Sequence, residues 1–386
     1  MDQVRLGVIG YGNMGRSHVK YFDQVKGLKF TAVADPDPKE TELLVKEHGV
    51  KAFTDGYELI NSGEVDAVLI ATPHYDHPPL TLAAFEKGLH VLCEKPIAVT
   101  AKAAQETIEA HKKHPELIYC GMFNQRTSPT WRAVKRLIDE GAVGELIRVG
   151  WTIQGWFRTQ AYYDSGGWRA TWKGEGGGVL INQCPHNLDL FCWFVGQPKR
   201  VTAAQVGLGK YHHIEVEDEV NALLEFENGA TGTFVTSTAE CSGINRLEIV
   251  GDNGTIIAEP GKPVRLLRNG TPTREFLATS PERFATPSRD TISIEPGEKD
   301  PGHRGITENF INAILHGEKL IAPAAEGILG LELGNAMLMS GLKHQPVDLP
   351  TDRNAFEGVL QDLIKNSTFK KREVKNTGAA DLAGTY

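Results

Sequence analysis

The first 123 residues alternate short apolar runs with amphipathic stretches. The apolar runs predict buried strands at residues 4–9, 30–34, 67–71, 90–93 and 118–120. The stretches between them carry apolar residues at every third or fourth position and predict helices at residues 14–22, 39–47, 79–87 and 101–114. Strands and helices in regular alternation are typical of a parallel, doubly wound sheet, so we expect a Rossmann domain here.

The pattern changes after residue 123. It predicts a helix at residues 130–140, a strand near 147–153 and, after a stretch rich in Trp and Gly, an apolar helix at about 179–195. Strand patterns dominate residues 200–268, a long polar surface loop is predicted at 272–301, and helices return at 305–316, 325–340 and 354–365. We therefore predict an α/β chain, with a doubly wound domain at residues 1–123 and an α+β domain at 124–386 that is built on a large, mainly antiparallel sheet.

Composition excludes several classes of function. The 386 residues carry a net charge of −8, which argues against nucleic-acid binding, and no apolar run reaches the ~18 residues of a membrane span. Five cysteines without a C-x-x-C spacing, and no leader-like N-terminus, predict a cytoplasmic protein. The segment 211–218 has metal-ligand residue types in no metal-binding spacing, so we predict solvated charges at a sheet edge and no metal. The basic run at 370–372 predicts a solvated tail.

The turn after the first predicted strand carries a G-x-G-x-x-G motif, which consists of Gly10, Tyr11, Gly12, Asn13, Met14 and Gly15. In such motifs the glycines permit a tight turn, a close approach of the backbone to a pyrophosphate, and close packing of the helix on the strand. The second strand leads to Asp35, whose carboxylate is placed to accept hydrogen bonds from ribose hydroxyls. Because this carboxylate would repel a 2′-phosphate, the predicted cofactor is NAD rather than NADP.

The predicted strand at 90–93 ends in Glu94-Lys95-Pro96, at the edge where a doubly wound sheet places its ligands. The tripeptide alone is equally typical of an exposed ion pair at a turn. It stands, however, in one order with the glycine motif, Ala71-Thr72-Pro73-His74, His77, and a Gly176-Gly177-Gly178 run followed by His186. With these motifs the chain resembles the glucose–fructose oxidoreductase/inositol dehydrogenase (Gfo/Idh/MocA) family over nearly its whole length.

The resemblance implies roles for residues near the nicotinamide. Lys95 would donate a hydrogen bond to the substrate oxygen that becomes the carbonyl, and Glu94 would bind the nicotinamide ribose. The ordinary lysine pKa of ~10.4 agrees with a donor that stabilises an oxyanion rather than with a base. The other implied cofactor contacts are Thr72, Pro73, His74, His77 and Asn124. Arg126 would join Asn124 as a polar pair at the domain junction and contact the substrate.

Asn182 and His186 are four residues apart and share one face of the predicted apolar helix. A single histidine on such a helix is usually a core residue, but His186 matches the family's catalytic histidine. Asn182 stands where the family has an aspartate, and it can orient a substrate group without holding a charge. His186 is then the predicted general base, aimed by Pro185. Asp189 is expected to cap or pack the helix.

The Trp- and Gly-rich stretch supplies three further predicted substrate contacts, namely Tyr163, Trp168 and Arg169. Aromatic rings beside an arginine suit the faces and hydroxyls of a sugar, although they equally suit a packed domain interface.

These residues predict an NAD-dependent dehydrogenase that acts on a secondary hydroxyl or ketone of a sugar, glycoside or cyclitol. Asn182 keeps open an NAD-dependent glycoside hydrolase, which would oxidise its sugar transiently and eliminate the aglycone. A non-catalytic dinucleotide sensor is a further alternative. The resemblance also implies a homodimer or homotetramer that forms through the open face of the C-terminal sheet.

Overall fold

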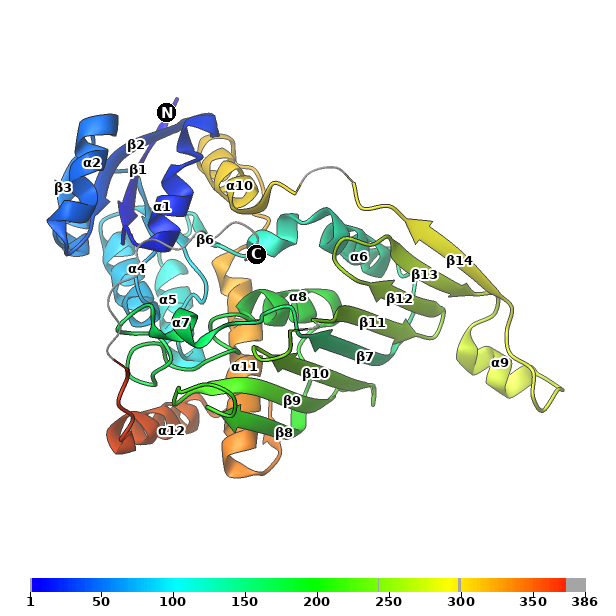
Figure 1. The fold of residues 1–386 in the computed structure, drawn as a ribbon. Coiled ribbons are helices and arrows are strands. Elements are labelled where there is room, and N and C mark those ends of the chain that lie inside the picture. The colour runs from blue at the N-terminus through cyan, green and yellow to red at the C-terminus, as the bar shows by residue number, and fades with distance from the viewer. Residues whose placement is uncertain (1, 242, 298–299, 373–386) are drawn as a thin grey trace.

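The computed structural model describes residues 2–241, 243–297 and 300–372, which form two β-sheets with a hydrophobic core each (Figure 1). The first sheet has parallel strands in the order β3-β2-β1-β4-β5-β6. Its strands are β1 (Val4–Ile9), β2 (Leu28–Ala34), β3 (Lys51–Phe53), β4 (Ala67–Ile70), β5 (His90–Cys93) and β6 (Tyr119–Gly121). The helices along this part of the chain are α1 (Asn13–Val19), α2 (Pro38–His48), α3 (Gly56–Asn61), α4 (His77–Glu86) and α5 (Ala101–His111). The predicted doubly wound sheet is confirmed.

Burial explains why these strands are short continuous apolar runs. Every residue of β4 is buried, as expected for a parallel strand that is covered on both faces of its sheet. One covering helix comes from far along the chain, since α10 (Gly302–His316) places Ile306, Phe310 and Ile311 in the core of the first sheet. The core of the N-terminal domain thus includes a helix that the predicted division at residue 123 does not anticipate.

The second sheet has the order β14-β13-β12-β11-β7-β10-β9-β8-β15. Its strands are β7 (Leu146–Ile153), β8 (Arg200–Leu208), β9 (Glu217–Glu225), β10 (Thr231–Ser237), β11 (Asn245–Gly251), β12 (Gly254–Ala258), β13 (Val264–Asn269), β14 (Arg289–Ile294) and β15 (Val347–Asp348). Strands β7 and β10 pair in parallel, and the other neighbours pair antiparallel. The sheet is therefore mainly antiparallel, as predicted.

Two helices, α8 (Pro185–Val195) and α11 (Gly327–Lys343), pack together on one face of this sheet (Figure 1). There the ring of Phe191 contacts the rings of Phe226 and Phe234. Strand β9 alternates accordingly, with Leu224 buried on the covered face and its neighbour Leu223 54% exposed on the opposite one. The remaining helices are α6 (Pro129–Asp139), α7 (Gln160–Asp164), α9 (Thr273–Thr279) and α12 (Arg353–Asn366), with short 3-10 turns η1 (Phe22–Gln24), η2 (His74–Asp76), η3 (Asn124–Thr127) and η4 (Ala324–Glu326).

Two predictions about elements are wrong. The helix predicted at 179–195 begins only at Pro185, because proline lacks an N–H group and is accommodated in the first helical turn. Asn182 therefore lies in the turns before the helix. The loop predicted at 272–301 contains α9 and β14, and α9 buries none of its residues, so no burial pattern indicated it.

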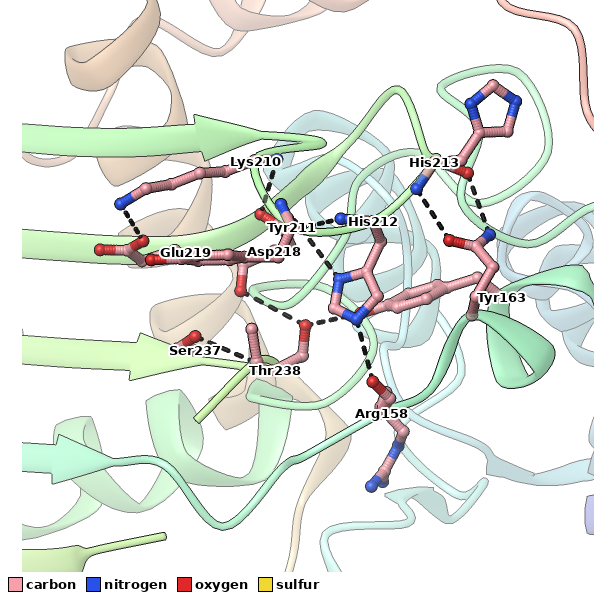
Figure 2. A network of polar contacts seen from close by, with 12 residues as sticks. Arg158, Tyr163, Lys210, Tyr211, His212, His213, Asp218, Glu219, Ser237 and Thr238 are labelled. Atoms are coloured by element: carbon pink, nitrogen blue, oxygen red, sulfur yellow. Dashed lines mark hydrogen bonds and ion pairs between the residues drawn. The ribbon is translucent and has the colours of Figure 1, made fainter. Parts of the chain in front are cut away.

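The predicted solvated edge at 211–218 is also wrong. Asp218 is fully buried, and its carboxylate accepts hydrogen bonds from the backbone N–H groups of Lys210, Tyr211 and His212 (Figure 2). The imidazole of His212 also contacts this carboxylate, at 3.0 Å. Asp218 is buried because it bonds His212 and backbone N–H groups at the start of β9, a pairing that the spacing of these residues does not reveal. None of the helices in the described ranges combines the length and apolar character needed to cross a membrane.

Candidate active site

A cavity of about 600 Å³ lies where the carboxyl ends of the first sheet's strands face the second domain. The predicted site residues that line it are Gly10, Gly12, Asn13, Met14, Asp35, Thr72, Pro73, His74, His77, Glu94, Lys95, Trp168, Arg169, Asn182 and His186. The predicted residues outside its lining are Tyr11, Gly15, Asn124, Arg126 and Tyr163. Motifs that are far apart in the sequence thus meet in one cavity. No group of three His, Cys, Asp or Glu side chains in the described ranges is placed to hold a metal ion.

The glycine turn after β1 fits a dinucleotide. Gly10 has a φ of +91°, and a Cβ atom there would lie 2.7 Å from the carbonyl oxygen of Ala71. A Cβ on Gly15 would overlap the carbonyl oxygen of Gly10, so this glycine permits the close packing of α1. At Gly12, in contrast, no atom lies within 4 Å of the position that a Cβ would take. This open space at the cavity wall is what a pyrophosphate needs to approach the backbone.

Asp35 directly follows β2, and its carboxylate is fixed by the backbone. Oδ2 accepts a hydrogen bond of 2.8 Å from the N–H of Tyr11, and Oδ1 accepts one of 3.0 Å from the N–H of Asp37. Tyr11 thus acts through its main chain rather than through its ring. Each carboxylate oxygen retains acceptor capacity for a ribose hydroxyl, and the negative charge disfavours a 2′-phosphate.

Lys95 follows β5 and reaches across the cavity to the second domain. Its Nζ atom donates a hydrogen bond of 3.0 Å to the backbone carbonyl oxygen of Asn182. Burial lowers the pKa of Lys95, while the charge of Glu94 opposes this shift. The arrangement holds a cationic donor at the boundary between the two domains, with further N–H groups left for a ligand.

Glu94 is buried and bound to a histidine. Its Oε1 atom lies 2.6 Å from Nε2 of His18, and Oε2 accepts a hydrogen bond of 3.1 Å from the N–H of Lys95. Burial raises the pKa of Glu94, but the hydrogen bond and charge of His18 outweigh it and bring the pKa to about 2. Glu94 is therefore a carboxylate at all physiological pH values and is suited to accept from a ribose hydroxyl.

His186 is the second residue of α8. Its ring is buried in the cavity wall, and neither Nδ1 nor Nε2 has a hydrogen-bond partner among the residues that the structure describes. Burial, followed by the charge of Lys95, lowers its pKa well below the ordinary histidine value. A buried polar group without a partner is costly, so its presence here indicates a ligand that completes it. A neutral imidazole in this position is suited to accept a proton.

Asn182 is held by a residue that we did not predict, Glu175. The Asn182 amide donates through Nδ2 to Oε1 of Glu175 and accepts through Oδ1 from the hydroxyl of Tyr162, at 3.2 Å. Burial raises the pKa of Glu175, and Arg169, with a guanidinium nitrogen 3.8 Å away, opposes this shift. The carboxyl group of Glu175 thus lies directly behind the asparagine that stands where the resemblance implies an aspartate. A charged residue immediately before the glycine run was the only signal for it in the sequence.

Two loops of the first domain are joined by histidines. His77 contacts the carbonyl oxygens of Pro96 and Thr72 at 2.7 and 2.9 Å, and His74 contacts that of Glu175 at 3.0 Å. Burial lowers the pKa of both imidazoles. The loops that carry these residues are thereby held against one another and against the second domain.

Tyr162, rather than the predicted Tyr163, lines the cavity. Tyr163 turns into the protein core and donates a hydrogen bond of 2.8 Å to Thr238. The guanidinium of Arg169 lies over the ring of Tyr162 at 4.7 Å and over that of Trp168 at 4.6 Å. Consecutive helical residues point in different directions, so the sequence alone did not distinguish the two tyrosines.

Arg126, a predicted substrate contact, does not line the cavity. Arg126 is buried outside the cavity lining and forms two hydrogen bonds, of 2.8 and 2.7 Å, with the carboxylate of Asp189. It also bonds Glu326 at 2.5 Å. A guanidinium that is occupied by two carboxylates has a structural role. Asn124 likewise lies away from the cavity lining, with its amide nitrogen 3.5 Å from a ring nitrogen of His303.

The basic run at 370–372 is not simply a solvated tail. Nζ of Lys371 donates hydrogen bonds to the carbonyl oxygens of Gly166 and Arg169, the latter at 3.0 Å. Just before it, the ring of Phe369 contacts that of His213 at 5.0 Å. The segment after α12 therefore packs on the loop that carries Trp168 and Arg169, because the lysine satisfies carbonyl groups of that loop.

Three features define the class of this protein: the glycine turn, the fixed acidic residue after β2, and a lysine and a histidine that face one cavity from two domains. They are typical of a two-domain, dinucleotide-dependent oxidoreductase. Sequence comparison agrees with this class. Residues 4–122 match the oxidoreductase family with an NAD-binding Rossmann fold, and residues 131–257 match the GFO/IDH/MocA C-terminal domain. The chain belongs to the Gfo/Idh/MocA family of oxidoreductases.

Similar proteins extend over almost the whole chain. An inositol 2-dehydrogenase of Rubrobacter xylanophilus is 27% identical, over 98% of this chain and 99% of its own length. A levoglucosan dehydrogenase of Pseudarthrobacter phenanthrenivorans is also 27% identical, over 91% and 99%. The WlbA dehydrogenase of Bordetella pertussis, solved with NADH and UDP-GlcNAcA, shares the fold with a TM-score of 0.74, at 24% identity, over 91% of this chain and all of its own.

Proposed function

We propose that this protein is an NAD-dependent dehydrogenase that oxidises a secondary hydroxyl of a sugar, glycoside or cyclitol, or reduces the corresponding ketone. The observation that carries the proposal is the buried His186, whose ring nitrogens are unpartnered in the same cavity as Lys95 and the glycine turn. Similar proteins named as inositol and levoglucosan dehydrogenases support the substrate class.

Bound NAD would supply the hydride acceptor, held by the glycine turn, Asp35 and Glu94. The neutral imidazole of His186 takes the proton of the substrate hydroxyl. Lys95 donates a hydrogen bond to the same oxygen while it becomes a carbonyl, and so stabilises the developing negative charge. The carbonyl oxygen of Asn182 holds the lysine in place from the second domain.

The glycoside hydrolase alternative would use the same two groups. The names of the similar proteins favour net oxidation, since those compared above are dehydrogenases. A hydrolase would release an aglycone without accumulation of NADH, which separates the two activities in one assay.

The test is the formation of NADH, followed by absorbance after purified protein is mixed with NAD and a panel of sugars and cyclitols. Lys95→Ala should lower kcat by a factor on the order of 10²–10³, the usual effect of removing an oxyanion donor. The matched control is Lys113→Ala, at an exposed position. The proposal is contradicted if Lys95→Ala keeps the kcat of the original protein.

We further propose that the protein is a homodimer or homotetramer in the cytoplasm. The half-open face of the second sheet supports assembly, and five cysteines without disulfide partners support a reducing compartment.

A further inference from the structure

The wall that the second domain contributes to the cavity is cationic. Among its lining residues, from Trp156 to His186, the charged side chains are those of Arg158 and Arg169, and Lys95 faces them from the first domain. The carboxylate of Glu175 lies behind this wall and pairs with Arg169. The half of the cavity where a substrate would bind therefore has an excess of positive charge.

Arg158 differs from Arg169 in its partners. The guanidinium of Arg169 is occupied by Glu175 and by the hydroxyl of Tyr162, at 2.8 Å. That of Arg158 donates only to the carbonyl oxygen of Phe157, at 3.0 Å, and pairs with no carboxylate among the described residues. It lies over the rings of Tyr162 and Trp156 at 5.1 and 5.6 Å. These rings position the guanidinium without neutralising its charge.

The main chain of Arg158 is held at both ends by a buried network (Figure 2). Its N–H donates to the carbonyl oxygen of Thr238 at 2.8 Å, and its own carbonyl oxygen contacts Nε2 of His212 at 2.9 Å. Asp218 joins the two, because its carboxylate binds His212 and its carbonyl oxygen accepts from the N–H of Thr238. Tyr163 completes the network through its bond to Thr238.

Figure 2 shows the side chain of Arg158 pointing away from this network. The buried groups thus fix the backbone and leave the guanidinium to the cavity. A positioned guanidinium with free N–H groups is suited to a planar or tetrahedral anion, which it can bind through two parallel hydrogen bonds.

We propose that Arg158 binds an anionic group of the substrate, so that the protein acts on a sugar that carries a carboxylate or a phosphate. The inference rests on the proposed dehydrogenase function, and it deepens that function by naming the substrate class. An anion at Arg158 would balance the charge of the guanidinium in this wall that pairs with no carboxylate among the described residues. The hydroxyl to be oxidised would then lie at His186, which lines the same cavity.

The test compares matched ligands: D-glucuronate, D-galacturonate and D-glucose 6-phosphate, each beside its neutral parent sugar. Binding to the NADH-loaded protein is measured by calorimetry, which requires no turnover. At least one anionic sugar should bind ten or more times more tightly than its parent. The ligand that binds most tightly shows whether the anionic group of the substrate is a carboxylate or a phosphate.

Arg158→Met should weaken binding of the preferred anionic sugar at least tenfold and change binding of its neutral parent less than twofold. The affinity for NADH should remain unchanged. Arg283→Met is the control, because it removes an equal charge at an exposed position far along the chain. The inference is overturned if no anionic sugar binds more tightly than its neutral parent. It is also overturned if Arg158→Met weakens the binding of the anionic sugar and of its parent equally, or weakens the binding of NADH instead.

The two proposals fail separately. Selective binding of an anionic sugar without NADH formation by any ligand contradicts the dehydrogenase function and leaves the anion site intact. Oxidation of neutral sugars, without tighter binding of anionic ones, supports the dehydrogenase function and contradicts the anion site.

Discussion

His186 is buried among groups that disfavour its protonation, and this makes the pH profile a direct test of its role. Because burial and Lys95 lower its pKa well below the ordinary value of ~6.5, the base is already neutral at pH 7. We expect kcat/KM to stay level as the pH falls through 6.5, and to decline about tenfold per pH unit only at lower pH.

Steady-state rates with saturating NAD and low substrate concentration measure this profile. His186→Asn should lower kcat by about 10²–10⁴ and remove the acidic decline, because no group at 186 then titrates. An inflection at or above pH 6.5, or its persistence in the variant, would assign the proton to another residue.

Asn182 and Glu175 form a hydrogen-bonded pair in which only Glu175 is ionisable. Asn182→Asp restores the aspartate of the family but places two carboxylates in contact. Repulsion between the two carboxylates raises the pKa of the pair above the unfolded-state pKa of ~4, so the folded protein keeps a proton that the unfolded chain has lost. The free energy of unfolding therefore falls as the pH rises from the unfolded-state pKa to the folded-state pKa of the pair. We expect a destabilisation on the order of 1–3 kcal/mol at pH 8 and less at pH 5, since one pKa unit corresponds to ~1.4 kcal/mol.

Thermal unfolding at the two pH values measures this effect. The double variant Glu175→Gln with Asn182→Asp keeps a single carboxylate and should recover most of the lost stability. If the Asn182→Asp variant is as stable as the original protein at pH 8, the two carboxyl groups do not influence each other's protonation.

The sequence predicted the residues of this site whose roles depend on local geometry. The glycine turn, Asp35 and Lys95 each follow a strand, so their position at the sheet edge was evident from the pattern. The role of Lys95, and both the position and the role of His186, came from the family resemblance. The hydrogen-bond partners of Asn182 were not evident from the sequence, because they depend on how the glycine-rich turns before α8 fold back. The partners of Arg126 were not predictable for a related reason, since its two carboxylates come from segments more than 60 residues away.

At the scale of elements, the segment after α12 holds the loop that carries Trp168 and Arg169 through the side chain of Lys371. Lys371→Met removes the donor to the carbonyl oxygens of Gly166 and Arg169. The loop should then be held less firmly, and the KM for the sugar should rise roughly 3- to 10-fold, which corresponds to about 1 kcal/mol. Lys370→Met is the matched control, because its side chain is exposed and only its backbone carbonyl contacts His213.

Initial rates at varied sugar concentration measure the effect, and the affinity for NADH should be the same in both variants. Equal KM values for Lys371→Met and Lys370→Met would show that the Lys371 contact has no influence on the loop.

Strands β1, β2, β4, β5 and β6 were predictable because burial imposes continuous apolar runs. Strand β3, which buries none of its residues, and the short helix α3 were not predicted. Beyond residue 123 the pattern was less informative. The exposed α9 and β14 carry no core-facing periodicity, and the apolar turns before α8 resemble a helix in composition. The network around Asp218 was missed because paired buried charges look like solvated ones in a sequence.

At the scale of the whole molecule, the two faces of the second sheet differ. One is covered by α8 and α11. The other keeps Leu223 half exposed on β9 and carries an ion-paired set on β7 and β11, in which Glu248 bonds Arg148 at 2.9 Å and Arg246 at 2.6 Å. A face that mixes apolar and paired polar groups is typical of a protein interface. It is the surface on which the proposed homodimer or homotetramer depends.

Val235 on β10 is partly exposed on the same face as Leu223. The prediction is that Leu223→Lys combined with Val235→Lys dissociates the assembly, because charges without partners would be buried in the interface. Light scattering at working concentration should then give the mass of one chain, against two or four for the original protein. Leu277→Lys is the control, since this residue is 78% exposed on α9, away from the face in question. A single-chain mass for the original protein would contradict the assembly itself, and an unchanged oligomer in the double variant would place the interface elsewhere on the molecule.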